Sequence, residues 1–155
     1  MKQAEQSRVR DIGLFFLLGL MDERTALTAA GRVIAQLKAQ YGDRFQSVPP
    51  VVLIRSCRAS WKAFRKSVPR NQPIEIPQAA WLLPSSPREI DISAWGRYQK
   101  DASDDDVMAL LFSHVLGFSD TDLAEGFQTS VGTIRYRLGK GVRQLGLVVR
   151  GGSAT

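Results

Sequence analysis

Cysteine and histidine are almost absent from this sequence. Cys57 and His114 are the only residues of their kinds among 155. A single cysteine excludes an internal disulfide, a Cys-x-x-Cys redox pair and a cysteine-rich zinc site, and it is typical of a reducing cytoplasm. A single histidine leaves any histidine-based catalytic or metal site without a partner, so we expect His114 on the surface of a helix. The chain also lacks a glycine-rich phosphate loop, a nucleophile motif and a suggestive carboxylate pair, so we expect neither enzymatic activity nor a cofactor or metal.

The hydrophobic runs in the chain are short. The strongest, from Ile12 to Met21, is far shorter than the ~20 residues that span a bilayer. A signal peptide is the alternative interpretation, because basic residues precede the run and small residues follow it. Asp11 before the run and Asp22 and Glu23 after it disfavour cleavage and translocation. We therefore expect a buried core helix, no membrane partner and a cytoplasmic protein.

Positive charge is in excess. The formal net charge is +6, and 44% of the residues are hydrophobic, which is enough to form a core. The positive excess favours a polyanionic partner, and the basic helix described below favours nucleic acid over a membrane.

Prolines divide the chain. Five of the seven lie between residues 67 and 103, where repeated proline prevents a long helix and favours an extended segment. Apolar residues in this segment indicate that it packs against its own domains or a partner; they are Trp81, Leu82, Leu83 and Trp95. We predict an all-α fold of two small helical domains joined by this Pro-rich linker, with domains at 1–68 and 103–150 and the linker at 69–102.

The first domain contains three predicted helices. The first runs from about residue 7 to 20, and the second is capped by Asp22 and ended by Gly42. The third segment begins with four β-prone residues and could start as a strand. A helix explains more of it, because apolar residues recur there in steps of three and four; they are Ile54, Cys57, Trp61, Phe64 and Val68.

Basic residues follow the same third helix. They form a second possible nucleic-acid face beside the buried one, composed of Arg55, Arg58, Lys62, Arg65 and Lys66. The alternative is a solvated face on which long side chains cover apolar surface with their stems.

The stretch from Ser119 to Gly146 predicts two helices joined by a tight turn. Ser119 can cap the first helix, and Thr129 or Ser130 the second. The second helix has an apolar face formed by Val131, Ile134, Leu138, Val142 and Leu145. At about 100° per residue, the opposite face carries Thr133, Tyr136, Lys140 and Arg143, with Arg135 and Arg137 on its flanks.

Such a helix suits the major groove of DNA. The predicted DNA contacts are Ser130, Thr133, Arg135, Tyr136, Arg137, Lys140 and Arg143. The alternative is a helix pair with a purely structural role and a solvated basic face. Gly139 and Gly141 lie inside the helix and each costs roughly 1 kcal/mol relative to alanine, so we expect its second half to be frayed or curved.

Acidic residues gather just before this pair. Seven acids and no lysine or arginine lie between Asp101 and Glu125. We expect Asp104 or a neighbouring aspartate to cap a helix here, because acids at a helix N-terminus are favourable. Acid on these helices would repel phosphates and orient the domain on DNA.

The stretch LFSHVLGFSDTDLAEGFQTSVGTIRYRLGKGVRQL resembles the last region of bacterial sigma factors, especially the extracytoplasmic-function group. The shared motifs are Gly117–Ser119, Leu123–Glu125 and Ser130–Leu138. The resemblance implies a sigma-type helix-turn-helix that contacts the promoter near its −35 element and docks on RNA polymerase. Gln128 and Thr129 depart from the family's turn residues.

The first domain is more faintly similar to the second region of the same family. LLGLMDERTALTAAGRVIAQL and VVLIRSCRASWKAFRKS occupy the places of its clamp-docking segment and its −10-contacting helix. Acids and glutamine are expected where Thr25, Leu27, Thr28 and Gly31 stand, so this region is degenerate.

Three functions remain open from the sequence. The first is a sigma-factor-like protein that binds double-stranded promoter DNA and the RNA polymerase core and initiates transcription. The second is a sigma-derived co-sigma subunit, adaptor or inhibitor that does not initiate alone and binds polymerase or another sigma factor by its apolar linker and first domain. An anti-sigma factor is a further possible partner of the protein. The third is a dimeric helix-turn-helix repressor, which would not associate with polymerase.

Overall fold

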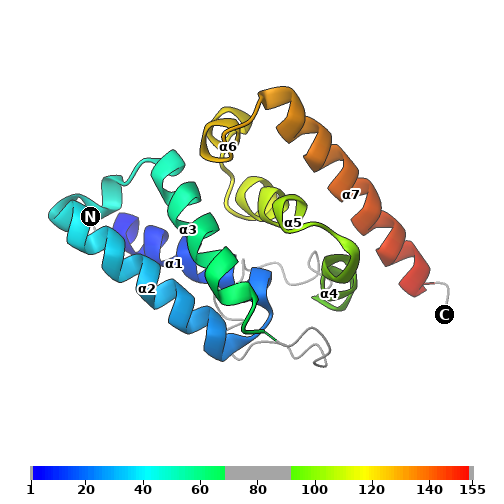
Figure 1. The fold of residues 1–155 in the computed structure, drawn as a ribbon, viewed down its shortest axis with the longest axis horizontal. Coiled ribbons are helices and arrows are strands. Elements are labelled where there is room, and N and C mark those ends of the chain that lie inside the picture. The colour runs from blue at the N-terminus through cyan, green and yellow to red at the C-terminus, as the bar shows by residue number, and fades with distance from the viewer. Residues whose placement is uncertain (1, 69–91, 154–155) are drawn as a thin grey trace.

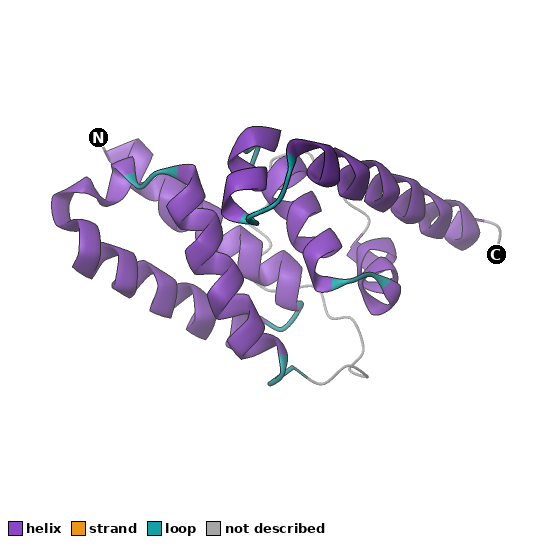
Figure 2. Cartoon of the chain, turned by 45° about the horizontal axis from the view of Figure 1, so that its top comes forward, coloured by secondary structure: helices purple, strands orange, loops and turns teal. Residues whose placement is uncertain are grey.

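The computed structural model describes residues 2–68 and 92–153, and every regular element in these two ranges is a helix (Figures 1 and 2). The all-α prediction is therefore confirmed for the described part of the chain. None of the described helices combines the length and the apolar character that a membrane-spanning segment requires.

The first two helices, α1 (Lys2–Leu20) and α2 (Glu23–Tyr41), form an antiparallel pair. Asp22 caps α2 as predicted, because one of its carboxylate oxygens accepts from the Thr25 backbone N–H at 3.0 Å. Gly42 follows the last residue of α2 with a φ of 53° and begins the short 3-10 helix η1 (Gly42–Ser47). The apolar run of α1 is buried from Ile12 to Leu20, as expected of a core helix.

The third helix, α3 (Pro50–Arg65), is helical from its first apolar residues, so the strand alternative is wrong. Pro50 is favourable at the first position of this helix, because the backbone N–H that proline lacks would have no hydrogen-bond partner within the helix at this position. Its buried residues are Leu53, Ile54, Cys57 and Trp61. The Trp61 ring lies against α1 at Gly19, where a Cβ atom would come within 1.9 Å of the indole.

Helix α4 (Ile92–Asp101) lies within the stretch predicted as linker, and it is anchored to the end of α1. The Trp95 indole N–H donates to the Leu18 carbonyl at 2.7 Å, and the Gln99 amide donates to the same oxygen at 2.9 Å. These donors satisfy a carbonyl that the last turn of α1 leaves free. Trp95 is thus packed on the protein's own first helix, whereas Trp81, Leu82 and Leu83 lie outside the described residues.

The rest of the chain forms α5 (Asp104–Leu110), the π-helical segment η4 (Leu111–Val115), α6 (Asp120–Gly126) and α7 (Val131–Ser153). The cap of α5 was predicted wrongly: Ser103, not an aspartate, accepts from the Asp106 N–H. Ser119 caps α6 as predicted. Gly117, with a φ of 75°, reverses the chain between η4 and α6.

One hydrophobic core joins these helices to the first three. It includes Phe15 and Phe16 from α1, Trp61 from α3, Phe112 from η4 and Ile134 from α7. Helix α6 packs on α3 so closely that a Cβ atom on Gly126 would lie 2.5 Å from the Ile54 methyl group. The division into domains at 1–68 and 103–150 stays a prediction; in the described residues the two parts pack directly on each other (Figure 1).

Candidate nucleic-acid interface

A closed turn connects α6 to α7 and sets their relative direction. Phe127 ends α6, and Gln128 follows in a left-handed conformation with a φ of 56°. The Gln128 N–H donates to the Glu125 carbonyl at 3.2 Å, and the Thr129 N–H donates to the Ala124 carbonyl at 2.9 Å. These two bonds form a Schellman motif, which here has glutamine at the position that usually holds glycine.

Ser130 caps α7, so one of the two predicted caps is correct. Its hydroxyl oxygen accepts from the Thr133 N–H at 3.1 Å and lies 2.9 Å from the Thr133 hydroxyl. The hydroxyl groups of Ser130 and Thr133 therefore hydrogen-bond to each other at the start of α7. They stand beside the free N–H groups of the first turn, where the partial positive charge of the helix is concentrated.

The buried face of α7 is centred on Ile134, which is fully buried, and continues through Gly141. Val142 was predicted on this face but is 49% exposed. The reason is a close approach at Gly141, where a Cβ atom would lie 2.9 Å from Leu110 and 3.0 Å from the Tyr98 hydroxyl. This glycine lets α7 lie on α5 and α4. The helix continues to Ser153, so of the two expectations for its second half, frayed or curved, fraying is wrong.

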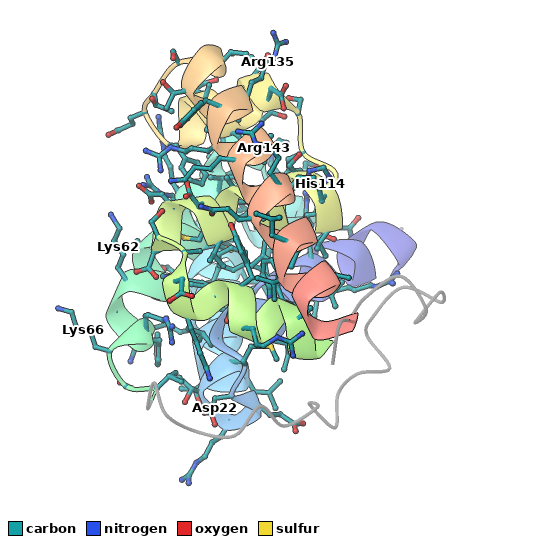
Figure 3. The ribbon with its side chains drawn as sticks, turned by 90° about the vertical axis from the view of Figure 1, so that its right-hand side faces the viewer. Asp22, Lys62, Lys66, His114, Arg135 and Arg143 are labelled. Carbon is teal, nitrogen blue, oxygen red and sulfur yellow. The ribbon has the colours of Figure 1, made fainter. Side chains whose placement is uncertain are left out.

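Two of the predicted contacts are at the centre of the outward face. Tyr136 is 65% exposed, and Arg143, about two helical turns later, is also exposed. Arg135 lies on the flank, where its Nε donates to Asp120 at 3.2 Å while most of its side chain stays in solvent. Figure 3 shows Arg135 and Arg143 on the outside of α7.

Arg137 and Lys140 are directed to a different side, toward the start of α5. The Arg137 guanidinium lies 3.5 Å from the Asp105 carboxylate and 3.6 Å from that of Asp106. The Lys140 ammonium lies 3.4 Å from Asp106, whose side chain is only 5% exposed. These two predicted DNA contacts are held by carboxylates of the protein itself.

The basic residues of α3 divide in the same way. Arg58 lies 2.9 Å from Asp105 and over the Phe127 ring, at 4.3 Å from its centroid. Arg65 lies 3.9 Å from Asp104, and Arg55 donates to the Glu125 carbonyl at 3.5 Å.

Lys62 and Lys66 complete the α3 set and point away from the protein (Figure 3). Both are exposed and have no ion pair to any residue in the two described ranges. Of the five basic residues predicted for this second face, two are therefore engaged by α5 and one by α6, and two have no ion pair within the described part of the chain.

The sequence did not predict that the aspartates of α5 pair with cations of other helices. Asp104, Asp105 and Asp106 were expected to favour the helix start and to repel phosphates, whereas they also neutralise cations from α3 and α7. The partners are distant in sequence, and an acidic first turn is ordinary for any helix. An excess of cations on the two flanking helices was the only signal available.

The single cysteine and the single histidine of the chain lie in different environments. Cys57 is fully buried, and its removal from water raises the pKa of the thiol well above its usual range. His114 is exposed on η4, as expected. A group of three or more candidate metal ligands is not found among the described residues.

Comparison with protein-family models, curated proteins and solved structures returns no match.

Proposed function

We propose that this protein is a sigma-factor-like transcription protein that binds double-stranded promoter DNA through α7, acting with the RNA polymerase core. The α6–turn–α7 pair is the helix-turn-helix, and α7 is the helix that enters the major groove. The protein works in the cytoplasm without a cofactor or metal and is not an enzyme.

The observation that carries this proposal is the exposed face of α7. Tyr136 and Arg143 project from it beside Arg135, behind a first turn capped by Ser130. An arginine can contact phosphates or the acceptor edge of guanine, and the tyrosine ring can pack against bases or sugars. The free N–H groups of Val131 and Gly132 at the helix start favour a phosphate. The resemblance of Ser130–Leu138 to sigma factors supplies the promoter as the target.

A direct binding measurement tests the α7 face. We expect Tyr136→Ala/Arg143→Ala to lower the affinity for a fluorescein-labelled duplex by about tenfold or more and to reduce the salt slope by about one, because one phosphate contact is lost. Fluorescence anisotropy titrations at several salt concentrations give both quantities. The matched control is Leu27→Ala/Arg44→Ala, which removes an exposed apolar residue of α2 and an exposed cation of η1. Helix α2 lies on the opposite side of the molecule from α7 (Figure 1). Equal losses in the two variants would reject α7 as the DNA-contacting helix.

A regulator that does not initiate alone is the second candidate function. It is favoured by the state of α3, where Arg58 and Arg65 pair with α5 instead of facing solvent. A helix whose cations are engaged in this way is poorly prepared to hold a second stretch of promoter DNA. The partner would then be another sigma factor, whose DNA contacts it supplements or blocks.

Transcription from purified components separates the two candidates. The protein is mixed with core polymerase and promoter fragments selected for binding, and run-off transcripts are measured with and without a second sigma factor. Transcripts from the protein and core polymerase alone support the sigma-like function. Polymerase association with transcripts only in the presence of the second factor supports the regulator, and no association with polymerase at all supports a simple dimeric repressor.

A further inference from the structure

Asp105 lies between the two basic helices and contacts both of them. One of its carboxylate oxygens is 2.9 Å from the Arg58 guanidinium of α3, and the other is 3.5 Å from the Arg137 guanidinium of α7. Asp106, the next residue, lies beneath Arg137 and Lys140. Three cations from two helices therefore share two carboxylates at the start of α5.

These ion pairs are partly shielded from water. The side chain of Asp106 is 5% exposed, that of Arg58 19% and that of Arg137 29%. Pairs of this kind are screened less by salt than pairs on an open surface, so they hold their cations more firmly. While these ion pairs are formed, the carboxylates already neutralise part of the charge that Arg137 and Lys140 would otherwise offer to phosphates.

Arg58 and Arg137 nevertheless lack some of their possible hydrogen bonds within the described part of the chain. The Nε–H groups of Arg58 and Arg137 are buried and have no hydrogen-bond partner among the described residues. A buried donor without an acceptor costs free energy that a new acceptor can recover. The closed arrangement therefore pairs the charges but leaves these two Nε–H donors without an acceptor among the described residues, and a phosphate that contacts Arg137 can offer its Nε–H the missing bond.

We propose that Asp105 and Asp106 form an autoinhibitory charge clamp that holds Arg137 and Lys140 away from DNA and must open for full binding. The proposal rests on the α7 DNA contact proposed above and describes how that contact is regulated. Because Asp105 also holds Arg58, opening the clamp loosens a link between α7 and the N-terminal helices. DNA affinity is thereby coupled to the packing of α3 against α5 and α6.

The clamp makes a prediction about salt dependence. With only Arg135 and Arg143 available, the slope of log K against log salt is about −2, and with Arg137 and Lys140 released it is about −4. The closed and open forms thus differ in a quantity that ordinary titrations measure.

The decisive comparison is between Asp105→Asn and Asp104→Asn. Each variant removes one negative charge from the first turn of α5. Among the described residues the only ion pair of Asp104 is with Arg65, at 3.9 Å, and the Asp104 side chain is 53% exposed. We expect Asp105→Asn to bind a labelled duplex of mixed sequence about three- to tenfold more tightly than Asp104→Asn, with a slope steeper by about one. The same gain in both variants would show a general charge effect and overturn the clamp, as would no gain for Asp105→Asn.

Failure of the clamp and failure of the α7 contact give different results. If Tyr136→Ala/Arg143→Ala weakens binding while Asp105→Asn and Asp104→Asn are equal, the α7 contact stands and the clamp is rejected. If the α7 double variant binds like its control, the α7 contact itself is rejected and the clamp with it. Circular dichroism establishes that each variant is folded.

A second measurement tests opening of the clamp in the wild-type protein, so it does not depend on whether the aspartate variants fold. The Nε–H of Arg137 is buried beside the carboxylates of Asp105 and Asp106 in the free protein. If the clamp opens, adding duplex changes the nuclear magnetic resonance chemical shift of this Nε–H, because its carboxylate neighbours are exchanged for phosphate. An unchanged chemical shift at saturating duplex means that α7 binds with the ion pairs intact, which overturns the proposal.

Discussion

The ring of Phe15 stacks on the ring of Phe112, with centroids 4.5 Å apart and planes inclined by 16°. Phe15 belongs to α1 and Phe112 to η4, so the contact joins the first helix to the part of the chain that carries α7. Phe15 also contacts Trp61 of α3, at 5.5 Å between centroids. The aromatic residues thus form a bridge between elements that the sequence had placed in separate domains.

Truncating this aromatic bridge should destabilise the whole protein, which should still unfold in a single cooperative transition. We expect Phe15→Ala to lower the free energy of unfolding by about 3–5 kcal/mol, because a fully buried ring is replaced by a cavity. Urea denaturation followed by circular dichroism and by tryptophan fluorescence should give coincident transitions. Leu27→Ala, at a 50% exposed position, is the control and should change stability by no more than about 0.5 kcal/mol. Two separate transitions, of which only one shifts in Phe15→Ala, would support independent domains instead.

The turn before α7 offers a stabilising substitution. Gln128 has a φ of 56°, a conformation that costs a non-glycine residue roughly 1 kcal/mol. We expect Gln128→Gly to raise the free energy of unfolding by about 0.5–1 kcal/mol, measured in urea. Gln128→Ala keeps the steric cost and removes the same exposed amide, so it should show no such gain. A loss of stability in Gln128→Gly would mean that the glutamine side chain contributes something that the turn geometry does not reveal.

Two glycines should respond in opposite ways to the same substitution. A methyl group on Gly126 would meet Ile54 at 2.5 Å, whereas one on Gly31 would meet nothing within 4 Å. Gly126→Ala should therefore destabilise the protein by about 1–3 kcal/mol through overpacking between α6 and α3. Gly31→Ala, in the middle of α2, should stabilise it by about 0.5–1 kcal/mol.

A double-mutant cycle identifies the cause of the first effect. Ile54→Ala shortens the side chain that the new methyl group would meet, so the combined loss in Gly126→Ala/Ile54→Ala should be smaller than the two single losses added. Additive losses would place the cost of Gly126→Ala elsewhere than at the α3–α6 contact.

The sequence predicted local structure well where a helix carries its own signals. Asp22, Ser119 and Ser130 mark helix starts by their side-chain oxygens, and Gly42 marks a helix end by its conformational freedom; all four do so in the structure. The helical period of α3 likewise outweighed its β-prone start, because burial of one continuous face decides between the two.

Local sequence patterns did not predict features that depend on contacts between residues far apart in the chain. Gly141, assessed by helix propensity alone, indicated a weak helix, but its small size permits the contact with Leu110 and Tyr98. Trp95 was expected to pack somewhere, but only the structure shows its bond to the Leu18 carbonyl. The pairing of Asp105 with both Arg58 and Arg137 depends on three helices meeting, and no local pattern specifies that. For the seven predicted DNA contacts, the sequence could assign each residue to a face of α7. It could not show which of the cations form ion pairs with carboxylates of the same protein.

Tyr98 gives the fold a sensitivity to alkaline pH. Its hydroxyl is buried without a hydrogen-bond partner among the described residues. Burial, and then the negative charge of Asp106, raise the pKa of Tyr98 from 10.0 to about 12. Because the folded state favours the protonated phenol, this contribution to stability is fully present below pH 10 and is lost as the pH rises through about 12.

Replacing Tyr98 with phenylalanine should remove that loss. At neutral pH we expect Tyr98→Phe to be at least as stable as the wild type, because no hydrogen bond is removed from the folded protein. Above pH 10 its advantage should grow, by on the order of 2 kcal/mol at the alkaline limit. Urea denaturation at a series of pH values measures the difference, and Tyr136→Phe, at a 65% exposed position, is the matched control. A constant difference between Tyr98→Phe and the wild type across pH 8 to 12 would show that the buried phenol does not set the alkaline limit.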